Sequence, residues 1–140
     1  MKRLVVVLAA VVAAACGGSS DTQSVVAPTG TVVTDTFSGT APVGTAQDPV
    51  LHTFTVQTAG TVNATMTAAG PPSTITMGVG IGNPTATGTC ALISGGSVAA
   101  TAGTTAQLTG TIGAGSYCVI VFDIGNALQP VAYTVAVAHT

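Results

Sequence analysis

The stretch Thr109–Asp123 has the sequence TGTIGAGSYCVIVFD, a glycine-rich turn followed by the most strand-like run of the chain. Successive side chains of a β-strand point to opposite faces. One face of this run would carry Tyr117, Val119 and Val121, and the other Cys118, Ile120 and Phe122. Apolar residues on both faces are typical of a strand that is buried on both sides. We therefore predict that this run is the central strand of a sheet.

Alternating runs on either side of this stretch predict the other strands. They cover residues 31–40, 50–57, 61–67, 74–81, 90–93, 104–109 and 131–138. Turn signals separate them, and residues 94–103 are predicted as a loop of small residues. Gly78 and Gly80 would share the outer face of their strand, which predicts a bulge, a bend or close approach by another segment. Short strands at this spacing indicate an all-β sandwich or barrel over residues 31–140.

The amino-acid composition argues against some classes of function. The chain has 140 residues, enough for one domain, and only 4% of them are charged. Lys2 and Arg3 are its only basic residues, and it contains no Glu. Without a basic surface, binding to nucleic acid or to anionic lipid has no electrostatic basis.

Residues 1–15 have the features of a signal peptide. Lys2 and Arg3 precede an apolar run from 4 to 15 that is shorter than the roughly 20 residues of a membrane-spanning helix, which makes a retained helix the weaker alternative. Three alanines then precede Cys16, as in a bacterial lipobox. We predict that Cys16 is the first mature residue and is lipidated, which would attach the protein to a membrane. The alternative is a free or intermolecularly paired Cys16.

Residues 16–30 are predicted to be the lipidated cysteine and a flexible tether. They are rich in Gly, Ser, Thr and Pro, and a chain of this length spans roughly 20 Å. Gly17, and not Asp, follows the cysteine, which in a Gram-negative host favours the outer membrane over the inner membrane. We therefore expect an exported protein that is lipid-anchored in the cell envelope.

Cys90 and Cys118 are the two cysteines that remain when Cys16 is lipidated. Export would bring them into an oxidising compartment, where a disulfide is the default expectation. Closing the loop between them would stabilise the domain by roughly 3 to 4 kcal/mol on the chain-entropy model. The alternative is a pair of buried free thiols.

Four short motifs resemble the bacterial pre-peptidase C-terminal domain. They are TFSGT at Thr36–Thr40, LHTFTVQTAG at Leu51–Gly60, GTIGAGSYCVIV at Gly110–Val121 and VAYTVAV at Val131–Val137. The resemblance implies an antiparallel, jelly-roll-like β-sandwich of about eight strands. Domains of this family are usually appended to secreted peptidases. The sequence departs from the family in two ways: residues 73–82 contain no acidic residue, and no peptidase precedes the domain. A stand-alone accessory module is therefore expected.

No group of residues predicts catalysis, a metal site or a cofactor. The candidates are His52, His139, Asp35, Asp48 and Asp123, and they show neither a Gly-x-Ser-x-Gly elbow nor metal-ligand spacing. His52 shares the parity of core residues, and we expect one of its ring nitrogens to be hydrogen-bonded. His139 is expected to fray at a chain end. No ligand-binding residue is predicted.

The expected function is therefore a non-catalytic binding or structural role at the cell envelope. One alternative is an auxiliary or inhibitor-like partner that acts in trans on a secreted peptidase. Another is a glycan-binding module, which would need an exposed aromatic platform. All five aromatic residues are placed on inferred core faces: Phe37, Phe54, Tyr117, Phe122 and Tyr133. The sequence predicts no oligomeric state.

Overall fold

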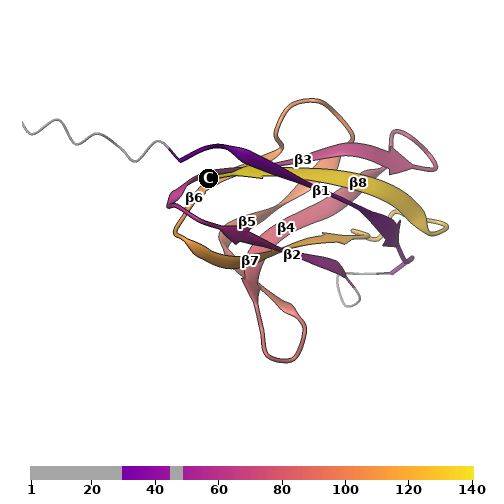
Figure 1. Cartoon of the computed structure of the whole chain (residues 1–140). Helices are drawn as coiled ribbons and strands as arrows, with labels where there is room; N and C mark the ends of the chain where they lie inside the picture. The colour runs from indigo at the N-terminus through magenta and orange to yellow at the C-terminus, as the bar shows by residue number, and fades with distance from the viewer. Residues whose placement is uncertain (1–29, 45–48) are drawn as a thin grey trace, which may run out of the picture.

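The computed structural model describes residues 30–44 and 49–140, which form eight strands (Figure 1). The predicted signal peptide, Cys16 and residues 17–29 of the tether lie outside the described residues. The strands are β1 (Val33–Ala41), β2 (Val50–Val56), β3 (Gly60–Gly70), β4 (Thr76–Pro84), β5 (Cys90–Thr101), β6 (Leu108–Ile112), β7 (Gly115–Phe122) and β8 (Val131–His139). Within the described part of the chain, no helix is long and apolar enough to cross a membrane.

The strands form two antiparallel sheets of four, in the orders β1-β8-β3-β6 and β2-β7-β4-β5. Strand β1 pairs with β8, β2 with β7, β3 with β6 and β4 with β5. Pairing of β3 with β8 and of β4 with β7 joins these four pairs into the two sheets. Four nested pairs joined in this way form the topology of a jelly roll. The prediction of an all-β antiparallel sandwich is confirmed, and a single core of alternating side chains fills the space between the sheets.

Strand β7 is the predicted central strand, with β2 on one side and β4 on the other. Val119 and Val121 point into the sandwich core and are completely buried. Cys118 and Ile120 point to the opposite face, and they are buried as well. The strand is therefore covered on both faces, as its sequence predicted.

The outer face of β4 is covered by its neighbours because it carries glycines. The ring of Phe122 lies over Gly78, and the side chain of Leu92 lies over Gly80. At Gly82 the backbone of β5 itself comes close. Two of the three predicted explanations for these glycines therefore apply, close approach by another segment and a bulge between Gly80 and Gly82.

The prediction of a loop at residues 94–103 was wrong, because residues 94–101 belong to strand β5. Leu92 pairs with Gly82 and Ser97 with Gly80, so residues 93–96 bulge opposite the single residue Ile81. Gly95 has a positive φ of 70° within this bulge, a conformation that glycine adopts readily. The small residues that suggested a loop instead form the bulge and the second half of a long strand.

A disulfide joins Cys90, the first residue of β5, to Cys118 in the middle of β7. The predicted pairing is confirmed, with a Cα–Cα distance of 5.9 Å. The two strands lie on opposite sides of β4. The bond therefore ties together three strands of one sheet.

Candidate functional site

The candidate site lies along one side of the sandwich, where the edge strands β1 and β2 face each other (Figure 1). Each edge strand directs a titratable residue between the sheets, Asp35 from β1 and His52 from β2. His139 at the end of β8 joins them. Both histidines of the chain therefore lie at this seam between the sheets.

His139 and Asp35 form a hydrogen-bonded pair, with Nε2 3.0 Å from Oδ2. The register of β1 against β8 brings together these two residues, which are 104 positions apart. His139 is only 3% exposed, so the expectation that it would fray was wrong. It continues the inward parity of Val135 and Val137, and this signal in the sequence could have placed it in the core.

The pair fixes the chemistry of the imidazole. A carboxylate can only accept hydrogen bonds, so Nε2 of His139 donates to Asp35 and, in the neutral ring, Nδ1 presents a lone pair. Nδ1 is buried and has no hydrogen-bond partner among the described residues. A buried polar atom without a partner costs about 1 to 3 kcal/mol. Such an atom indicates a place where a water or a ligand donates a hydrogen bond.

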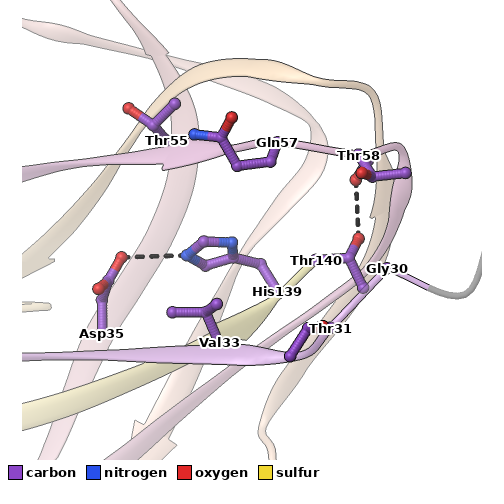
Figure 2. Close-up of a pocket in the computed structure, with 9 residues that line it drawn as sticks. All are labelled: Gly30, Thr31, Val33, Asp35, Thr55, Gln57, Thr58, His139 and Thr140. Atoms are coloured by element: carbon purple, nitrogen blue, oxygen red, sulfur yellow. Dashed lines mark hydrogen bonds and ion pairs between the residues drawn. The ribbon is translucent and has the colours of Figure 1, made fainter.

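A pocket of about 520 Å³ opens beside this pair (Figure 2). It is lined by Gly30, Thr31, Val33, Asp35, Thr55, Gln57, Thr58, His139 and Thr140. Figure 2 shows the imidazole lying between β1, which carries Val33 and Asp35, and the end of β2, where Thr55 and the following Gln57 lie. The volume of the pocket lies within the usual range for small-molecule sites.

His52 lies farther along the same seam and forms a second polar contact between the sheets. Its Nε2 is 2.8 Å from the hydroxyl of Tyr133, and its ring stacks on Phe37 with centroids 5.0 Å apart. The expectation of a satisfied ring nitrogen is thus confirmed. Burial lowers the pKa of His52 and raises the pKa of Tyr133 to about 12, so both groups are held in their neutral forms near neutral pH.

Aromatic residues pack beneath the pocket and offer no flat platform. Phe54 lies 5.2 Å from the His139 ring and 5.9 Å from the Tyr117 ring, measured between centroids. Phe54 and Tyr133 are buried, and Phe37, Tyr117 and Phe122 are partly buried. None of the five aromatic side chains is exposed, so the stacking surface expected of many glycan-binding modules is missing from the described part.

Asp123 lies in the loop after β7 and has a structural role there. Its carboxylate accepts hydrogen bonds from the backbone N–H groups of Gly125, Asn126 and Ala127, and from Gly44 in the β1–β2 loop. Burial alone would raise the pKa of Asp123, but these four bonds lower it below the usual value. The residue therefore clamps two loops together. Asp48, the third acidic candidate of the domain, lies outside the described residues.

In the described ranges, no group of three or more His, Cys, Asp or Glu side chains could hold a metal ion. A comparison of the chain with protein-family models, with curated proteins and with solved structures found no match in any of the three.

Proposed function

We propose that the protein is an exported, lipid-anchored and non-catalytic β-sandwich that binds a ligand or partner at the cell envelope. The observation that carries the proposal is the Cys90–Cys118 disulfide in the folded domain. Such bonds persist in oxidising compartments and are rare in the cytosol. The leader at 1–15 supplies a route of export, and Cys16 supplies the anchor. In a Gram-negative host, Gly17 after the anchor favours the outer membrane.

The chemistry of the pocket supports binding in preference to catalysis. Asp35 engages Nε2 of His139, and Nδ1 contacts no hydroxyl or thiol among the described residues. A histidine activates a Ser, Thr or Cys nucleophile of the protein only when that side chain lies within hydrogen-bond reach. The pair is better suited to hold a ligand that donates hydrogen bonds.

The strand motifs favour a second, narrower proposal, that the domain is a relative of pre-peptidase C-terminal domains. A jelly-roll sandwich is compatible with this relationship, but unrelated proteins share the fold. In that case the protein would act in trans on a secreted peptidase. The purified protein should then change the cleavage rate of a peptidase encoded beside its gene, and an unchanged rate would remove this second role.

Lipidation is tested by growing cells that express the chain with a radioactive fatty acid. The wild-type protein is expected to carry the label and to partition into detergent, and Cys16→Ser is expected to lose both properties. Cys90→Ser is the matched control, because it removes a cysteine of the domain and should keep the label. An unlabelled, soluble wild-type protein would contradict the lipid anchor.

A further inference from the structure

The pocket beside His139 exposes part of a carboxylate. The Asp35 side chain is 39% exposed, and its Oδ2 is held by His139. Its Oδ1 makes no hydrogen bond to another described side chain. Because His139 fixes the position of the carboxylate, Oδ1 is a preorganised acceptor at the mouth of the pocket. Preorganised acceptors bind donors with little loss of side-chain entropy.

The other polar groups around the pocket also accept hydrogen bonds. In the neutral ring Nδ1 of His139 is an acceptor, and the hydroxyls of Thr31 and Thr55 and the amide of Gln57 can each accept as well as donate. With a neutral His139, no side chain in the lining is a donor alone. Gln57 is exposed, and Figure 2 shows its side chain extended above the imidazole.

Charge decides between the ligands that could donate to these acceptors. The described residues include no Lys or Arg, and the chain has a formal net charge of −2. A phosphate or carboxylate ligand would meet Asp35 without any compensating cation. A neutral hydroxyl ligand is tolerated, but an ammonium ligand adds a charge-assisted hydrogen bond to Oδ1, and such bonds are roughly twice as strong as neutral ones.

We propose that the pocket between β1 and β2 binds an organic ammonium group, with the Asp35 carboxylate as its charged acceptor. His139 acts as a positioning residue that holds the carboxylate and offers Nδ1 as a second acceptor. This inference rests on the proposed binding function and adds the chemical class of the ligand. The ammonium group can belong to an aliphatic amine or to an amino sugar.

The test is a titration of the exported chain carrying Cys16→Ser with n-butylamine at neutral pH, where the amine is charged. A dissociation constant in about the millimolar range is expected for so small a ligand. The neutral isostere n-butanol should bind more weakly than n-butylamine, and the anion butyrate should not bind. Glucosamine is the second probe: binding of one amine but not the other identifies the carrier of the ammonium group and supports the proposal, and binding of neither overturns it.

Variants locate the ammonium site. Asp35→Asn, which keeps the shape and an acceptor for His139, should weaken n-butylamine binding by about tenfold or more. Thr36→Ala is the matched control on the neighbouring residue, which is exposed on the other face of β1, and it should bind like the parent protein. Equal binding of n-butanol, or undiminished binding by Asp35→Asn, would overturn the proposal.

A spectroscopic measurement keeps the proposal testable if Asp35→Asn does not fold. The imidazole ¹⁵N signals of His139 should move when n-butylamine binds, because Nδ1 gains a donor, and those of His52 should stay in place as an internal control. Unmoved His139 signals at saturation would exclude the role of Nδ1. Failure to bind n-butylamine would not affect the result of the fatty-acid labelling. The ammonium site and the lipid-anchored binding protein are therefore tested separately.

Discussion

Gly82 in β4 should tolerate no side chain, and Gly82→Ala tests the close approach of β4 and β5. Gly82 is buried between Leu92 of β5 and Cys118 of β7. A Cβ atom at this position would collide with the carbonyl oxygen of Ala91 and would lie 2.6 Å from its carbonyl carbon and 2.8 Å from the Cα of Leu92. These are backbone atoms of a paired strand, so no side-chain rotation can relieve the contact.

The expected loss of stability follows from two opposing effects. Forcing an extra methyl group into a packed site costs about 1 to 3 kcal/mol, and the upper end applies because backbone must move. Replacing glycine restricts the unfolded chain and returns about 0.5 to 1 kcal/mol. The net loss for Gly82→Ala is therefore about 2 kcal/mol, which lowers the melting temperature by about 8 °C for a domain of this size.

The same substitution at Gly110 in β6 is the matched control. The nearest atom to a Cβ there is Cγ1 of Val62, at 3.9 Å, which is an ordinary contact. Gly110→Ala should therefore stabilise the domain by about 0.5 to 1 kcal/mol. Both variants are compared with the parent protein by urea unfolding, followed by far-UV circular dichroism. Equal stability of Gly82→Ala and the parent protein would refute the close β4–β5 approach.

Three further perturbations have expected outcomes. Replacing both Cys90 and Cys118 by alanine should lower the free energy of unfolding by about 3.6 kcal/mol, since the bond closes a loop with a sequence separation of 28; a urea midpoint equal to that of the parent would contradict this. Because the folded pKa of Asp123 is lowered, its stabilisation is present above about pH 4 and is lost as the pH falls through the folded value. Asp123→Asn should flatten this part of the curve of urea midpoint against pH, and an unchanged slope would exclude the clamp. The folded pKa of His52 is also lowered, so stability should fall as the pH drops below about 6.5. His52→Gln, which can keep the bond to Tyr133, should reduce that fall. An identical fall in both proteins would contradict a lowered folded pKa of His52.

The strands were predictable because their side chains alternate, and the failure at β5 has a physical cause. Alternation depends on a strict period of two, and the bulge at 93–96 interrupts that period. Gly95 and Gly96 add the composition of a turn, although here Gly95 adopts the positive φ of the bulge and Gly96 lies close to the carbonyl oxygen of Ile81. A local pattern cannot distinguish such a bulge from a loop, because the partner strand decides which one forms.

The site was less predictable than the fold because it depends on the register of strands that are distant in the sequence. Parity alone places Asp35 and His139 on inward faces, but only the pairing of β1 with β8 brings them within hydrogen-bond distance. Cys90 and Cys118 could be paired from the sequence because elimination left two cysteines in the domain. No comparable elimination selects one Asp–His pair from the acidic residues and the two histidines.

The inward position of Asp35 on β1 has one explanation that requires no ligand, which is protection against self-association. A charged residue that points inward from an edge strand discourages pairing with a second molecule, and β1 is an edge strand. That role would be served by the carboxylate alone, and it gives no reason for a buried Nδ1 without a partner in the adjacent ring. A purely protective Asp35 predicts that Asp35→Asn increases self-association and that the carboxylate contributes nothing to n-butylamine binding. A ligand site predicts the loss of binding in a variant that stays monomeric, so sedimentation measured beside the titration assigns the carboxylate to one role or the other.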